Sequence, residues 1–167
     1  MNELNYPEIG AVGRGERPPG YGHFAYRVRL GGPDHFPTAV GDLLSGRMHA
    51  RAGIRLRASA PTVAPGVVLV QRLRVGPIEV VAPVRVLEVG REPDRAWLTY
   101  GTLRGHPEQG EERFLIERGE SVTFTISGFV RPAAWYARLG APVSHLYQRL
   151  ITARYLRALR EDAAWTR

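Results

Sequence analysis

The segment GHPEQGEE (residues 105–112) carries the densest set of side chains that can do chemistry. His106, Glu108, Glu111 and Glu112 fall within seven positions, and imidazole and carboxylate groups can bind a metal or exchange protons. Their spacing matches no helical ligand motif such as HExxH, and the same composition is typical of a solvated loop between two strands. We therefore expect no metal site here. Acid–base chemistry and a surface role remain alternatives.

Glu111 and Glu112 fall in or beside an expected strand, where adjacent side chains point to opposite faces. One of the two must therefore share a face with the apolar residues of that strand. A carboxylate facing an apolar interior has its pKa raised by desolvation unless an arginine pairs with it. Arg85 and Arg104 are the candidate partners.

Tyr100 and Thr102 alternate along the preceding expected strand, so they can place two hydroxyl groups inside a cavity. The alternative is that Tyr100 is a core residue with its hydroxyl at the rim. Trp135 stands at the start of the last expected helix. It is a candidate lining residue, although packing is the commoner role of such a side chain.

Arg47, His49 and Arg51 come directly after the first expected helix. A histidine among arginines can recognise an anionic head group or a carboxylate. The plainer alternative is a hydrated turn that is anchored by Met48.

These candidates must be positioned by a regular series of elements. Gly and Pro are frequent in residues 1–22, which indicates an extended N-terminal arm. The hydrophobic pattern predicts a helix over residues 34–45 and an amphipathic helix over residues 133–159 that is interrupted at Gly140 and Pro142. Period-two runs and turn residues predict strands over residues 23–30, 54–58, 67–75, 78–89, 96–103, 112–117 and 122–130. Pro83 predicts an edge or a bulge within its strand.

The predicted fold class is α+β, with a curved antiparallel sheet of about seven strands wrapped on the long C-terminal helix. Short turns favour antiparallel neighbours, and that helix is the element available to cover the apolar face of the sheet. We expect the arm at residues 1–22 and a single domain at residues 23–167, since the 167-residue chain has the length of one domain. The space between sheet and helix is either filled by side chains or holds a ligand.

Composition excludes several classes of protein. The chain has no Cys, which removes thiol nucleophiles, disulfides and zinc fingers. No window approaches the roughly 18 apolar residues of a membrane span, and residues 1–10 have no features of a leader, so we expect a cytoplasmic protein. The net charge is +7 and all 23 basic residues are Arg, but no docking motif predicts specific nucleic-acid binding.

Six segments of the chain match a known family. They are LNYPEIGA (4–11), PPGY (18–21), GRMHARAG (46–53), YGTLRGHPEQGEERF (100–114), F-x-RPA (129–133) and RYLRAL (154–159). On these segments the chain resembles the bacterial and plant family known as domain of unknown function nineteen-ninety. That family is similar to the START and Bet v 1 group of helix-grip folds. The resemblance implies a fold that binds hydrophobic ligands or, in some branches, catalyses the cyclisation and dehydration of polyketides. It carries no catalytic residue over to this chain.

Three functions follow as hypotheses. The leading one is the binding of a hydrophobic small molecule or lipid in a pocket between the sheet and the C-terminal helix, without a cofactor. The second is a cyclase- or dehydratase-like enzyme that uses Glu111 or Glu112 with His106 or Tyr100 as acid and base in the same pocket. The third is binding of acidic partners through the Arg-rich C-terminal helix, for which a solvated helix face is the simpler interpretation. The oligomeric state stays open.

Overall fold

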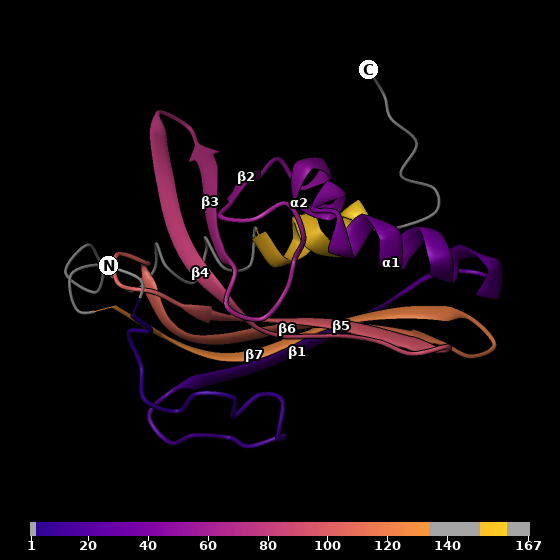
Figure 1. Ribbon diagram of the computed structural model, residues 1–167, viewed down its shortest axis with the longest axis horizontal. Coiled ribbons are helices and arrows are strands. Elements are labelled where there is room, and N and C mark those ends of the chain that lie inside the picture. Colours follow the sequence, from indigo (N-terminus) through magenta and orange to yellow (C-terminus); the bar gives the residue numbers. More distant parts are fainter. Residues whose placement is uncertain (1–2, 134–150, 160–167) are drawn as a thin grey trace.

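A seven-stranded antiparallel sheet forms the frame of the computed structural model, which describes residues 3–133 and 151–159 (Figure 1). The strand order is β1-β7-β6-β5-β4-β3-β2, so each strand from β2 to β7 pairs with its neighbour in sequence and β1 pairs with β7. The strands are β1 (Gly22–Gly31), β2 (Arg55–Ala58), β3 (Val68–Val75), β4 (Ile78–Arg91), β5 (Arg95–Thr102), β6 (Glu108–Arg118) and β7 (Val122–Pro132). The predicted antiparallel sheet is confirmed.

Helices connect β1 to β2 and lie on one side of the sheet (Figure 1). They are a 3₁₀ turn η1 (Pro33–His35), α1 (Phe36–Leu44) and α2 (Arg47–Arg51). The sequence pattern predicts the first two as one helix and does not predict α2, which has five residues and begins after Gly46 in the left-handed conformation, with φ 78°. Residues 151–158 are helical and lie on the same side as α1. The part of the expected C-terminal helix at residues 134–150 lies outside the described residues.

The main core fills the space between these helices and the inner face of the sheet. Strand alternation directs every second side chain inward, so Phe114 and Ile116 of β6 and Phe124 and Ile126 of β7 are fully buried. From the helical layer they are joined by Phe36, Val40, Leu43, Tyr155, Ala158 and Leu159. This arrangement confirms the α+β fold class, with an apolar sheet face covered by helices.

β4 curves the sheet toward the helical layer. Its register with β5 shifts between Val86 and Glu88, which marks a β-bulge, and bulges increase the local bend and twist. Pro83 comes one residue before Val84, the first residue of β4 that pairs with β5. The missing N–H of Pro83 therefore falls where β4 parts from β5, in agreement with the expected edge. In Figure 1, β3 and the adjoining half of β4 rise beside α2.

The N-terminal arm lies against the opposite face of the sheet (Figure 1). Tyr6, Ala11 and Tyr21 are buried around Phe129 of β7 and form a second, smaller apolar cluster. The rings of Tyr21 and Phe129 meet edge to face, with centroids 4.9 Å apart. None of the helices in the described part of the chain is long and apolar enough to cross a membrane.

Candidate ligand pocket

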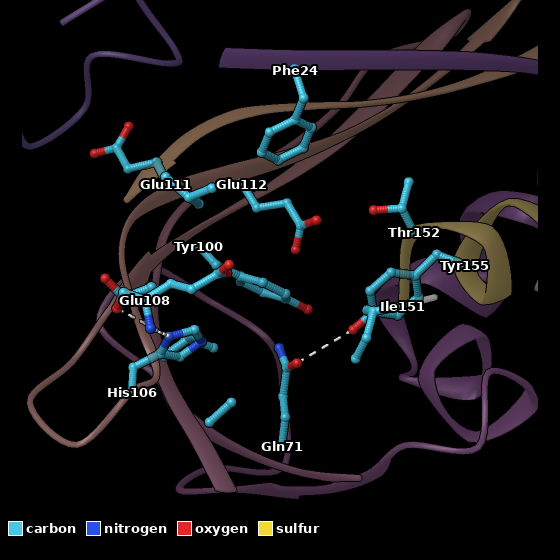
Figure 2. Close-up of a pocket in the computed structure, with 14 residues that line it drawn as sticks. Phe24, Gln71, Tyr100, His106, Glu108, Glu111, Glu112, Ile151, Thr152 and Tyr155 are labelled. Carbon is cyan, nitrogen blue, oxygen red and sulfur yellow. Dashed lines mark hydrogen bonds between the residues drawn. The ribbon is translucent and has the colours of Figure 1, made fainter. Parts of the chain in front are cut away.

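A cavity of about 60 Å³ lies between the inner face of the sheet and residues 151–155 (Figure 2). Its volume is sufficient for about four or five water molecules. The apolar part of its lining includes Phe24, Ala82, Val84, Val130 and Ile151. The polar part includes Gln71, Tyr100, His106, Glu108, Glu112, Thr152 and Tyr155. Side chains from six strands and the C-terminal helical segment thus converge on one small space.

Glu112 and Tyr100 face each other across β6 and β5 and point into the cavity (Figure 2). The Glu112 carboxylate is half-buried and has no hydrogen-bond or ion-pair partner among the residues that the structure describes. Burial raises the pKa of Glu112 to about 8, and the neighbouring Glu108 carboxylate acts in the same direction. Glu112 is therefore mostly protonated at neutral pH.

His106 and Glu108 lie at the start of β6, where the chain turns into the cavity wall. The Glu108 backbone contacts His106 Nδ1 twice, with its N–H at 2.9 Å and its C=O at 3.1 Å from that nitrogen. Burial lowers the pKa of His106 to about 4, whereas it raises the pKa of Glu108 to about 7. At neutral pH the imidazole is thus neutral and lies beside a carboxyl group that exchanges its proton readily.

Tyr100 is held by a partner that lies behind it in the core. Its hydroxyl is 3.0 Å from Nε2 of His49, a residue of α2 with no exposed surface. The rings of Phe114 and Tyr155 meet the imidazole edge to face, and burial lowers the pKa of His49 to about 4. His49 is therefore neutral, and it positions Tyr100 rather than reaching the cavity itself.

Glu111 has a different role, because its carboxylate points away from the cavity (Figure 2). It accepts hydrogen bonds from the Tyr6 hydroxyl at 2.9 Å and from the backbone N–H groups of Gly10 and Val12. Glu111 borders the cavity because of its place in β6, and its carboxylate does not enter the cavity. Glu111 thus fixes the N-terminal arm to the outer face of the sheet.

Thr102 also borders the cavity, but its hydroxyl is engaged on both sides. It donates to Asn5 Oδ1 at 2.6 Å and accepts from the Gly110 N–H at 2.9 Å.

The segment at residues 105–112, which the sequence predicts as a loop, is partly strand, because Glu108 already pairs with Pro132 of β7. The loop interpretation of residues 108–111 is therefore wrong, since β7 is long enough to extend the ladder in this direction.

The arginines proposed from the sequence do not meet the cavity carboxylates. Arg47 Nε lies 2.6 Å from Asp42 Oδ1, and Arg51 also binds this buried carboxylate. Arg85 points to the face of β4 opposite Val84, and Arg104 forms an exposed ion pair with Glu3 at 3.1 Å. Trp135 lies outside the described residues.

Solved structures with similar folds cover most of the chain. A hypothetical protein from Helicobacter pylori superposes with a TM-score of 0.61 and 10% identity over 95% of each chain. Major latex-like protein 151 from Panax ginseng superposes with a TM-score of 0.57 and 15% identity, over 81% of this chain and 95% of that one. Truncated norcoclaurine synthase from Thalictrum flavum superposes with a TM-score of 0.53 and 11% identity, over 84% of this chain and 94% of that one. These likenesses show a Bet v 1-like helix-grip fold.

Sequence relatives match shorter stretches. A UPF0548 protein from Deinococcus radiodurans is 44% identical over 77 residues, which are 45% of this chain and 39% of that protein. A UPF0548 protein from Dictyostelium discoideum is 38% identical over 60 residues, or 30% and 27% of the two chains. The matches thus span less than half of these relatives. Residues 5–158 match the family described as Domain of unknown function (DUF1990), and the chain belongs to that family.

Proposed function

We propose that this protein binds a small, largely apolar molecule in the cavity between the sheet and residues 151–155. The observation that supports the proposal is the unpaired Glu112 carboxyl group in a cavity whose other walls include Phe24, Val84 and Ile151. A partly buried carboxyl group without a partner costs stability, and such groups are concentrated at functional sites. A core that served stability alone would place an apolar side chain or an arginine there.

The fold supports the same proposal, because Bet v 1-like proteins typically bind hydrophobic ligands between sheet and helix. The cavity of about 60 Å³ is smaller than the roughly 300–1,000 Å³ of pockets that enclose a drug-sized molecule. The proposed ligand therefore inserts one end, of about four or five non-hydrogen atoms, and leaves the rest nearer the surface.

Acid–base catalysis on the bound molecule is the second candidate. It is favoured by the combination of Glu112, Tyr100 and His106 in one cavity, where a protonated carboxyl group and a hydroxyl group can donate to a carbonyl oxygen. Glu112, rather than Glu111, is the carboxylate for this role, because Glu111 binds the arm. Loss of turnover in Glu112→Gln with retained ligand affinity would identify the enzyme.

Native mass spectrometry of freshly purified protein, followed by solvent extraction, tests the binding proposal. We expect a bound molecule, and adding it at about 100 times Kd should raise the free energy of unfolding by about 2.7 kcal/mol. Ala82→Leu places a larger side chain in the cavity wall and should abolish binding, whereas Ala25→Leu, at an exposed position of β1, should not. Undiminished binding by a folded Ala82→Leu protein would contradict this location for the site.

A further inference from the structure

We propose that the ligand carries a protonated amine and that Glu108 and Glu112 recognise this ammonium group inside the cavity. The inference rests on the proposed function and names the chemical class of the molecule. It is carried by the charges of the cavity wall, by one unpartnered histidine nitrogen and by the rings that surround the carboxylates.

The cavity carboxylates stand apart from the other acidic residues that the structure describes. Most of those form ion pairs with arginines, as Asp42, Glu79 and Glu88 do, or accept several hydrogen bonds, as Glu111 does. Glu8 accepts one hydrogen bond, from the Tyr21 hydroxyl. The described acids whose carboxylates have no such partner are Asp34, Asp94 and Glu120, which are exposed, and Glu108 and Glu112, which are not. The latter two therefore lack both an internal cation and full hydration.

An arginine would be the usual solution, and this chain has 23 of them and a net charge of +7. None of the described residues that line the cavity is an arginine. The side chains around Glu112 are neutral or acidic: Phe24 from β1, Gln71 from β3, Tyr100 from β5, Glu108 from β6, and Thr152 and Tyr155 from the C-terminal segment. The wall thus offers two carboxyl groups and no cation of its own, and these carboxyl groups can ionise to pair with a cation from outside the chain.

His106 adds a polar group to the same wall. Its side chain lines the cavity and the residue is only 8% exposed. Nδ1 is engaged by the Glu108 backbone, whereas Nε2 has no partner among the described residues. Nε2 can therefore form a hydrogen bond with a polar group of the ligand that lies close to its amine.

An organic ammonium fits the site better than a metal ion. Within residues 3–133 and 151–159, no three His, Asp or Glu side chains are placed to hold a metal. The rings of Phe24, Tyr100 and Tyr155 line the cavity, and aromatic faces attract alkylammonium groups. The small volume admits an ammonium group on a short carbon chain.

Calorimetric titration of the full chain with n-butylamine, n-butanol and butyrate tests the inference. At pH 7 we expect n-butylamine to bind about tenfold or more tightly than n-butanol, and butyrate not to bind. Glu112→Gln keeps the shape and a hydrogen-bond donor but cannot ionise, so it should weaken n-butylamine about thirtyfold. Glu120→Gln, at an exposed carboxylate, is the matched control and should bind like the parent protein.

Proton release gives a second readout that does not depend on affinity. An ammonium group that pairs with a protonated carboxyl group displaces its proton, so n-butylamine should release protons at pH 6.5, as seen by comparing buffers of different ionisation heat. Glu108→Gln should lower the release, and thermal unfolding confirms that each variant is folded. n-Butanol should release none.

The outcomes separate this inference from the proposed function. Equal affinity for n-butanol and n-butylamine, or unchanged n-butylamine affinity in Glu112→Gln, would overturn amine recognition and leave binding of apolar molecules standing. If none of the three probes binds but native mass spectrometry finds a neutral molecule on the protein, amine recognition is likewise overturned and binding of apolar molecules stands. Failure of all three probes together with an empty protein would overturn both proposals.

Discussion

Glu111 and Glu112 are neighbours in sequence and act on opposite faces of β6. Glu111 accepts hydrogen bonds from the N-terminal arm, whereas Glu112 points toward Tyr100 in the cavity. Each of them has a glycine as one of its two cross-strand partners: Gly101 lies opposite Glu111 on β5, and Gly128 lies opposite Glu112 on β7. One dipeptide therefore connects the arm to the candidate site.

Glu111→Gln should detach part of the arm. The carboxylate accepts three hydrogen bonds, from Tyr6, Gly10 and Val12, while a glutamine offers one acceptor oxygen and leaves donors unsatisfied. We expect the free energy of unfolding to fall by about 1–3 kcal/mol, as measured by urea denaturation, and proteolytic cleavage within residues 7–20 to become faster. Tyr6→Phe, which removes one of the three bonds, should have a smaller effect. Parental stability in Glu111→Gln would contradict this role.

Glu112→Gln should stabilise the protein in a pH-dependent manner. The pKa of Glu112 is raised from 4.5 to about 8, so the stability linked to its protonated form is fully present below pH 4.5 and is lost as the pH rises to 8. The variant should equal the parent near pH 4.5 and exceed it by roughly 1–3 kcal/mol at pH 8.5. Urea denaturation at the two pH values checks this result, with Glu120→Gln as the control. A difference that is the same at both pH values would show that ionisation is not its cause.

Gly101→Ala should displace Tyr6. A Cβ atom at position 101 would lie 2.3 Å from the Tyr6 hydroxyl and 2.8 Å from Leu4 Cδ2, which is closer than real Cβ atoms approach. We expect a loss of about 1–3 kcal/mol in the free energy of unfolding, because the arm must move and Glu111 loses a donor. Gly119→Ala is the matched control, since a Cβ there meets no atom within 4 Å. Equal stability of the two variants would argue against close packing of the arm.

His49 should make the protein sensitive to acid. Burial lowers the pKa of this histidine from 6.5 to about 4, so its contribution to stability is present above pH 6.5 and is lost as the pH falls toward 4. His49→Gln can still bond the Tyr100 hydroxyl but cannot be protonated. Between pH 6.5 and 4 the free energy of unfolding of this variant, measured by urea denaturation, should fall less steeply than that of the parent. The difference between the two slopes should be about 1.4 kcal/mol per pH unit. An unchanged slope would place the acid sensitivity elsewhere, with His106 as the next candidate.

The sequence pattern located most of the sheet. Strand ends from local periodicity fall close to the observed ones, as for residues 122–130 against β7 (Val122–Pro132) and residues 96–103 against β5 (Arg95–Thr102). Period-two alternation and turn residues are local properties, so they can be read without knowing which strands meet. A five-residue helix such as α2 is too short to show a helical period, so the sequence pattern does not predict it.

The same alternation determined that Glu111 and Glu112 lie on opposite faces, but not which of them faces the cavity. That choice depends on partners far away in the chain, since Glu111 is bound by residues 99 to 105 positions before it. His49 and Tyr100 are 51 positions apart, and neither sequence context indicates that they meet. Residue types and their spacing thus defined the candidates. Only tertiary packing decided which of them are desolvated, paired or left facing a cavity, because desolvation and charge pairing depend on distances in space.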